Sequence, residues 1–152
     1  MRIGPLSPAE REDLIAIWLD LENARIHPDD SPEQVRRWVE DGTWGVWERD
    51  TGELIGDCTL FFSADDHNAW EVGYGLRRDR WGRGYATEAV QGCLRHGFED
   101  LGLDRIVADL TDPDNWRSQH VLEKCGFVRS GGTDAHPVFE VTRARWRASR
   151  LG

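Results

Sequence analysis

Residues 77–89, with the sequence RRDRWGRGYATEA, place four arginines and two glycines between two regular patterns. An alternating strand pattern ends just before this arginine–glycine stretch, and a helical pattern begins inside it. The start of a helix leaves backbone N–H groups without intrahelical partners and carries a partial positive charge. Glycine at that point lets a ligand approach the backbone closely. We therefore predict an anion site here, best suited to phosphate groups.

Two common nucleotide-binding loops do not match the stretch. A Walker loop needs the pattern GxxxxGK(S/T), which the sequence lacks. A dinucleotide fingerprint needs a third glycine three residues after the second, but Thr87 holds that position after Gly82 and Gly84. The sequence therefore disfavours both nucleotide-binding interpretations.

The elements around the stretch must hold it in place. Ser7-Pro8-Ala9-Glu10 and Ser31-Pro32-Glu33-Gln34 each predict a helix start, because serine caps the helix and proline fits its first position. Residues 44–49 and 54–62 read as strands joined by a turn at 50–52. The later expected elements are a strand at 70–76, a helix to about 100, a strand at 106–110, a helix from Asn115 to Gly126, and strands at 127–129 and 138–142.

This order of strands and helices predicts one mixed α/β domain over residues 1–152. Hairpins occur together with a strand–helix–strand unit, so we expect a mixed sheet rather than a purely parallel one. The arginine-rich end, residues 143–152, is expected to be a solvated tail or an edge.

Length and charge narrow the function classes. The chain has 152 residues and a formal net charge of −9. Nucleic-acid-binding proteins are normally basic, so the charge argues against that class and is compatible with a cationic substrate. No apolar run approaches the length of a membrane span, and residues 1–5 show no signal-peptide pattern. We expect no nucleic-acid or membrane partner and a cytoplasmic location.

Thiols and imidazoles suggest no further chemistry. Cys58, Cys93 and Cys125 are scattered without a CxxC pair, which argues against disulfides and against a zinc site. Cys93 and Cys125 lie on apolar helix faces and are expected to be buried structural thiols. The five histidines share no spacing, so we expect no metal.

Residues 81–86, WGRGYA, resemble the coenzyme A loop of the GCN5-related N-acetyltransferases, in which Gln or Arg opens a run with two small residues. Residues 81–89 further resemble W-G-(K/R)-G-Y-A-T-E-A, a pattern of the branch that acetylates ribosomal-protein N-termini. The segments 52–56, 70–74 and 114–127 resemble the family's central hairpin, fourth strand and asparagine-to-Gly-Phe segment. Residues 1–40 match only loosely.

The resemblance implies a fold and a cofactor. It implies a mostly antiparallel sheet of about six to seven strands with about four helices, and acetyl-CoA as the co-substrate. Trp81 replaces the opening Gln or Arg, so phosphate contacts must come from backbone N–H groups and from Arg78 and Arg83, with Arg77 and Arg80 behind them. The expected cofactor-binding residues are Leu76, Arg78, Trp81, Gly82, Arg83, Gly84, Tyr85, Ala86 and Asn115.

Acetyl transfer to nitrogen needs a neutral amine, so a group must accept a proton from it. Glu71 is our first candidate base, because Gly73 and Gly75 leave space on its strand face; the alternative is a surface carboxylate. Asp112 is the second, with turn formation as the alternative. The resemblance implies that many relatives carry a tyrosine, which protonates the leaving thiolate, at the position of Leu122. We expect Ser118 to be the acid in its place.

The acceptor is the open point. The branch resemblance favours a protein N-terminal α-amine, whereas the acidic charge also suits a small polycation such as an aminoglycoside or a polyamine. Trp18 and Trp38 are candidates for lining its pocket. A non-catalytic acyl-CoA-binding module, as well as a monomer or a homodimer, stays open at this stage.

Overall fold

A computed structural model of the protein describes residues 1–20, 31–40, 42–64, 67–110 and 116–151. The chain forms two compact units. The first unit holds Met1–Thr59 with Tyr74–Ala89, and the second holds Leu60–Gly73 with Val90–Gly152. Strands β3 and β4 contribute residues to both units.

Seven strands and five α-helices are described. In chain order they are β1 (Arg2–Pro5), α1 (Pro8–Leu19), α2 (Pro32–Glu40), β2 (Trp44–Trp47), β3 (Leu54–Ser63), β4 (Ala69–Leu76), α3 (Tyr85–Arg95), β5 (Arg105–Asp109), α4 (Trp116–Lys124), β6 (Val128–Gly132), β7 (Pro137–Thr142) and α5 (Arg143–Leu151). A 3-10 turn (Arg78–Arg80) precedes α3, and a π turn (His96–Asp100) follows it. None of these helices is long and apolar enough to cross a membrane.

The strands follow the hydrogen-bonded order β1-β2-β3-β4-β5-β7-β6. The pair β4–β5 is parallel, while β1–β2, β2–β3, β5–β7 and β6–β7 are antiparallel. This confirms the predicted mixed, mostly antiparallel sheet. The parallel pair is the one joined by a helix, as a parallel connection requires.

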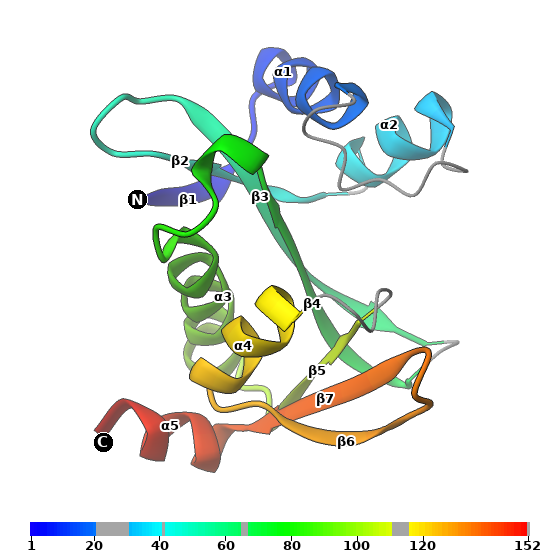
Figure 1. The fold of residues 1–152 in the computed structure, drawn as a ribbon, viewed down its shortest axis with the longest axis vertical. Helices are drawn as coiled ribbons and strands as arrows, with labels where there is room; N and C mark the ends of the chain where they lie inside the picture. Colours follow the sequence, from blue (N-terminus) through cyan, green and yellow to red (C-terminus); the bar gives the residue numbers. More distant parts are fainter. Residues whose placement is uncertain (21–30, 41, 65–66, 111–115, 152) are drawn as a thin grey trace. The chain divides into compact units, whose positions relative to one another are not determined.

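In the first unit, local sequence signals set α1 and α2 as predicted. Ser7 caps α1: its hydroxyl accepts from Glu10 N at 3.2 Å, and Glu10 Oε1 accepts from Ser7 N at 3.0 Å. The Ser31 hydroxyl accepts from Gln34 N at 3.2 Å. The two helices lie side by side (Figure 1) and pack Leu14, Ile15, Trp18, Val35 and Val39 into one buried cluster with Leu6 and Trp47.

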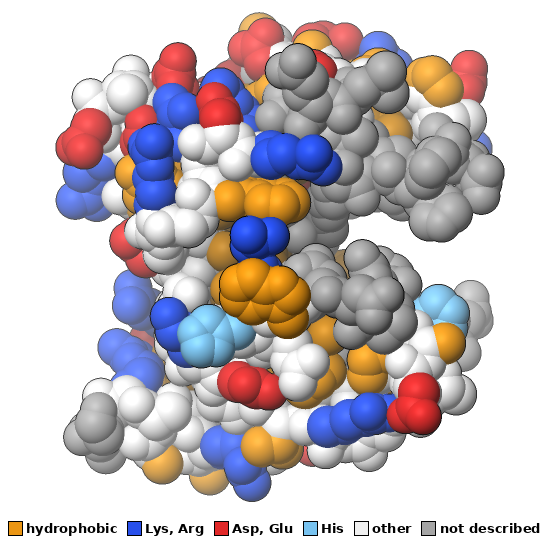
Figure 2. Space-filling view, viewed as in Figure 1, with side chains coloured by type: hydrophobic (Ala, Val, Ile, Leu, Met, Phe, Trp, Pro, Cys, Tyr) orange, Lys and Arg blue, Asp and Glu red, His pale blue; other side chains and the backbone are white. Residues whose placement is uncertain are grey.

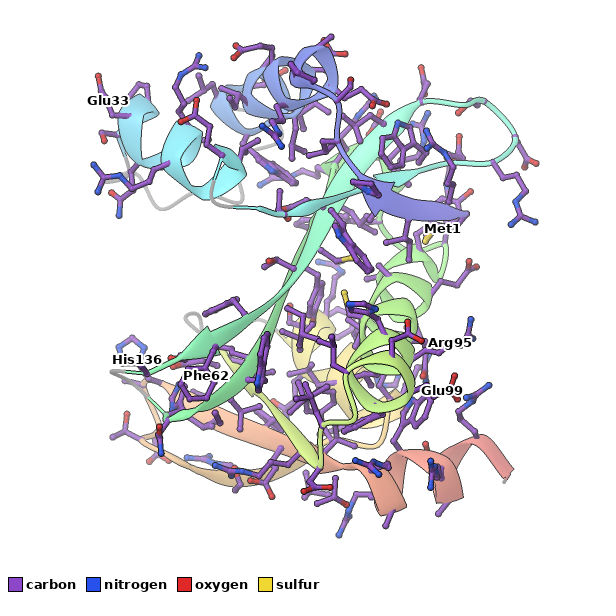
Figure 3. The ribbon with its side chains drawn as sticks, turned by 180° about the vertical axis from the view of Figure 1, so that it is seen from behind. Met1, Glu33, Phe62, Arg95, Glu99 and His136 are labelled. Atoms are coloured by element: carbon purple, nitrogen blue, oxygen red, sulfur yellow. The ribbon has the colours of Figure 1, made fainter. Side chains whose placement is uncertain are left out.

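In the second unit, β7 pairs with both β5 and β6, and its side chains alternate between buried and partly exposed. His136 lies in the turn between β6 and β7 (Figure 3). The register Val107↔Glu140 on one side and Val128↔Glu140 on the other fixes the three strands relative to one another. The predicted final strands are thereby confirmed.

The expectation of a solvated tail over residues 143–152 is wrong, because residues 143–151 form α5. Trp146 is only 1% exposed, its ring centroid lies 5.3 Å from that of Phe98, and its Nε1 donates to Gln91 Oε1 at 2.9 Å. Arg150 donates to Glu99 in the π turn at 3.4 Å. A single buried tryptophan, Trp146, anchors this nine-residue helix despite its arginines.

The arginine–glycine stretch leaves the end of β4, which packs tightly on β3. A Cβ atom at Gly56 of β3 would lie 2.1 Å from Gly75 O and 2.9 Å from Leu76 Cδ2. The Arg77 N–H donates to Ile55 O at 2.7 Å in the same region. Position 56 therefore needs a residue without a side chain, as close backbone approach in a sheet requires.

We expect Gly56→Ala to lower the free energy of unfolding by about 1–3 kcal/mol, because the added methyl overpacks the contact with Gly75. Urea denaturation measures the change. The matched control is Gly4→Ala on β1, where a Cβ atom meets nothing within 4 Å. Equal stabilities of the two variants would contradict the close contact.

Candidate active site

The arginine–glycine stretch forms a loop between β4 and α3 in the first unit. Gly82 and Gly84 have φ angles of 78° and 82°, a region that residues with a side chain rarely adopt. No atom outside the neighbouring residues lies within 4 Å of a Cβ atom at either position. The two glycines therefore make the turn and leave open space over the backbone.

The start of α3 faces this turn. Glu88 N donates to Gly84 O at 3.2 Å, which is an i to i−4 helical bond. Helix geometry gives no intrahelical partner to the N–H groups of the residues before Glu88. These donors and the positive end of the helix dipole are the elements of an anion site.

Arg77 and Arg80 donate hydrogen bonds to carboxylates of the loop and of the neighbouring hairpin. Arg80 is 14% exposed; its Nε donates to Glu48 Oε2 at 3.2 Å, and its other nitrogens donate to Asp79 and Glu53. Arg77 donates to Asp79 at 2.7 Å. These ion pairs hold the loop together.

Arg78 and Arg83 are exposed residues of the same loop. The Arg78 guanidinium lies 5.4 Å from the Trp81 ring centroid, and Trp81 Nε1 donates to Leu76 O at 3.0 Å. The Trp81 side chain thus fastens the loop to the last residue of β4 and carries Arg78 at its face. Figure 2 shows Lys and Arg side chains next to apolar ones on the viewed face of the molecule.

Glu48, at the end of β2, is the centre of the loop's hydrogen bonds. Its side chain is 5% exposed and accepts from the Tyr85 hydroxyl at 2.8 Å, from the Thr51 hydroxyl at 2.8 Å and from Arg80. Arg83 approaches it at 3.6 Å. The hydrogen bond from Tyr85, then that from Thr51, holds the pKa of Glu48 below its usual range. The same bond to Glu48 raises the pKa of Tyr85.

Backbone hydrogen bonds of the hairpin hold Glu48 in place. Gly52 N donates to Glu48 O at 2.8 Å, and Glu48 N donates to Glu53 O at 2.9 Å. The sequence indicated this turn but not the role of Glu48, since no local pattern joins residue 48 to residues 80 and 85. The available signal was an acidic residue directly after a strand made only of Trp, Gly and Val.

The other predicted cofactor residues are placed as follows. Leu76 is 7% exposed and offers its carbonyl oxygen to Trp81. Tyr85 and Ala86 form the first turn of α3 and are partly exposed. Asn115 and the candidate base Asp112 lie outside the described residues. Ser118 lies in the first turn of α4 and is partly exposed.

The second unit brings Glu71 together with two residues that sequence reasoning did not select. One oxygen or nitrogen atom from each of His67, Glu71 and Asp109 lies within 4.8 Å of the others. His67 Nε2 lies 3.1 Å from Asp109 Oδ2, and the side chains of these two residues are 17% and 26% exposed. We call these three residues the His67–Glu71–Asp109 cluster.

Strand pairing explains the cluster. β4 and β5 are parallel, with Glu71 opposite Val107. Asp109, two residues after Val107, lies on the same face of the sheet as Glu71 because side chains alternate along a strand. Sequence spacing could not reveal it, since residues 71 and 109 meet only through this pairing.

All three thiols are buried, which was expected for Cys93 and Cys125. Burial raises the pKa of Cys125 to about 12, so this thiol stays protonated and is a poor nucleophile at neutral pH. The predicted structural role of Cys125 agrees with this environment.

Comparison with known proteins identifies the family. Residues 1–128 match the model of the acetyltransferase (GNAT) domain. The chain belongs to the GNAT family. It is 39% identical over 88 residues to an uncharacterized N-acetyltransferase, YoaA, of Bacillus subtilis, an alignment that covers 58% of this chain and 49% of YoaA. This GNAT chain spans about half the length of the curated relatives it matches.

Solved structures share the fold at low sequence identity. A ribosomal-protein-S5-alanine acetyltransferase from Vibrio fischeri superposes with a TM-score of 0.74 and 20% identity, covering 95% of the GNAT chain described here and 93% of that protein. A spermidine N-acetyltransferase from Vibrio cholerae, in complex with CoA and spermine, has a TM-score of 0.73 and 17% identity, with coverages of 96% and 97%. The predicted fold is confirmed.

We expect Glu48→Gln to weaken coenzyme A binding severalfold and to lower the Tm at neutral pH, because Arg80, Arg83 and Tyr85 lose their ionised acceptor. A folded-state pKa below the usual value means that Glu48 stabilises the fold above that value and less as pH falls through the folded pKa. The Tm difference from the wild type should therefore shrink in acid.

Titration calorimetry and thermal melts at several pH values measure these effects. Glu40→Gln, an exposed carboxylate of α2 near Arg36, is the control and should change neither quantity. Wild-type coenzyme A affinity in Glu48→Gln would contradict the positioning role.

Proposed function

We propose that this protein is an acetyl-CoA-dependent N-acetyltransferase that moves an acetyl group to a primary amine by direct attack in a ternary complex. The observation that carries the proposal is the loop of Gly82 and Gly84 at the start of α3. Membership of the GNAT family supports the same donor.

The donor half rests on the fit between this loop and a pyrophosphate. Two glycines with positive φ angles leave the backbone open, and the start of α3 supplies N–H donors. Arg78 and Arg83 are exposed and can approach phosphate oxygens, and Arg83 also lies 3.6 Å from Glu48. Arg77 and Arg80 donate to Asp79, Glu53 and Glu48. Trp81, Tyr85 and Ala86 line the same turn, and we assign Leu76 and Asn115 to the cofactor as well.

The chemical half rests on Glu71. Acetyl-CoA supplies the acetyl group and a thiol leaving group. A lysine-like amine has a pKa of about 10.4 and is almost wholly protonated at pH 7, so a base must accept its proton before nitrogen attacks. Glu71 lies on β4, the strand that leads into the loop, and we assign it this role. Ser118 is assigned as the proton donor to sulfur, and Asp112 as the second candidate base.

For the acceptor we favour a protein N-terminal α-amine, because residues 81–89 carry the pattern of the branch with that activity. Its lower pKa, about 8, also makes deprotonation easier. A small polycation is the second candidate, which the net charge of −9 and the likeness to the spermidine acetyltransferase fold support.

Release of free thiol from acetyl-CoA with a panel of amines tests the proposal. The panel should hold peptides with free N-termini, polyamines and an aminoglycoside. We expect turnover with at least one class, and highest kcat/KM with the peptides. Acetyl-CoA binding without thiol release on any amine would point to a non-catalytic binding module instead.

Two substitutions should separate donor binding from chemistry. Glu71→Gln should lower kcat by about a hundredfold or more with little change in the Kd for acetyl-CoA, since it removes only the proton acceptor. Gly84→Val should mainly raise that Kd, because a β-branched side chain is strained at positive φ and covers the open backbone. Calorimetry and steady-state kinetics measure the two effects.

The matched control for Gly84→Val is Gly102→Val, which has a similar φ of 69° and equally open surroundings in the second unit. It should cost stability without a change in acetyl-CoA affinity. Equal effects of Glu71→Gln and Gly84→Val on binding would refute this division of roles.

A further inference from the structure

We propose that His67, Glu71 and Asp109 together form the site that binds the ammonium group of the acceptor and removes its proton. The proposal rests on the proposed acetyl transfer and extends it: the proton acceptor is a three-residue cluster rather than Glu71 alone. All three residues belong to the second unit.

The spacing of the cluster suits an ammonium group. A primary ammonium has three N–H donors in tetrahedral directions, and acceptors at ordinary hydrogen-bond distances from its nitrogen lie about 4.6 Å apart. Each of the three side chains offers one polar atom, and these atoms all lie within 4.8 Å of one another, so a single ammonium group can lie beside all three. Two of these side chains are carboxylates, which provide the negative charge that a cation requires.

One oxygen of the cluster lacks a donor. Asp109 Oδ1 is buried and has no hydrogen-bond partner among the described residues, which omit 65–66 and 111–115. A buried acceptor without a partner carries a cost in free energy, and an N–H from a bound amine would remove that cost. The His67 and Asp109 side chains are 17% and 26% exposed, so part of each side chain is open to solvent, while Oδ1 itself is covered.

The contact between His67 and Asp109 prepares the imidazole to accept a proton. An ionised carboxylate only accepts hydrogen bonds, so the 3.1 Å contact to Asp109 Oδ2 places the hydrogen of a neutral ring on Nε2. Nδ1 then keeps its lone pair. A carboxylate that fixes the histidine tautomer and stabilises the imidazolium is the arrangement of serine-hydrolase triads.

The ammonium nitrogen loses two protons during the reaction. The ammonium gives one proton to the cluster, at Glu71 or the His67 imidazole, and that proton later passes to water. The neutral nitrogen forms its bond to the acetyl carbon, the C–S bond breaks, and its electron pair goes to sulfur. The second proton lost by nitrogen ends on sulfur as the coenzyme A thiol.

The test measures His67→Gln, Asp109→Asn and the wild type with two acceptors. One is an alkyl amine with a pKa of about 10.4, and the other is a peptide α-amine with a pKa of about 8. We expect kcat/KM to fall by about a hundredfold for the alkyl amine and distinctly less for the α-amine, which is deprotonated more easily. The Kd for acetyl-CoA should not change. A merely structural role would lower both activities equally.

His96→Gln is the matched control. His96 Nδ1 lies 2.9 Å from Asp100 Oδ2, so it forms another histidine–aspartate contact in the same unit, on the π turn. This variant should keep wild-type activity with both amines. Thermal melts of all variants separate loss of function from loss of fold.

Three outcomes would overturn the proposal. The first is equal loss, or no loss, with both amines in His67→Gln and Asp109→Asn. The second is wild-type activity that EDTA abolishes and Zn²⁺ restores, which would make the cluster a metal site. In both cases the wild type still releases thiol, so acetyl transfer itself stands. The third, no thiol release by the wild type with any amine, would overturn the proposed function as well.

Discussion

The buried Glu48 carboxylate is the point to which the arginine–glycine stretch is attached. It accepts from Tyr85 at the start of α3, from Arg80 in the 3-10 turn and from Thr51 in its own hairpin. A buried carboxylate is costly unless it is fully paired, so these bonds act as a unit. Gly82 and Gly84 supply a backbone that a ligand can approach. Glu48 holds that backbone in place through its bonds to Arg80 and Tyr85, which lie on either side of the two glycines.

The carboxylates around Glu48 also give the arginines different roles. Ion pairs with Glu48, Glu53 and Asp79 hold Arg80 inside the loop. Arg78 and Arg83 are the exposed arginines of the loop, and we expect these two to meet an anion. An all-cationic loop would repel itself without such acids. The acidic residues of the hairpin thus explain how four arginines can be close together in a chain with a net charge of −9.

Much of the fold could be predicted from the sequence, because its signals are local. The capping serines Ser7 and Ser31, the turn at Gly52 and the glycines of the loop each act on neighbouring residues. Features that depend on pairing between distant segments could not be predicted. The tail expectation failed because one tryptophan, Trp146, outweighs its arginine neighbours once it is buried. His67 and Asp109 join Glu71 only through strand pairing, and Glu48 meets Tyr85 across 37 residues.

The most direct measurement of the central claim is an amide NMR titration of the protein with coenzyme A and, separately, with pantetheine. If the glycine loop at the start of α3 holds the pyrophosphate, coenzyme A shifts the N–H signals of Gly82, Gly84 and Tyr85 strongly, and pantetheine, which has no phosphate, leaves them in place. Saturation with coenzyme A that does not move these three signals would contradict the claim.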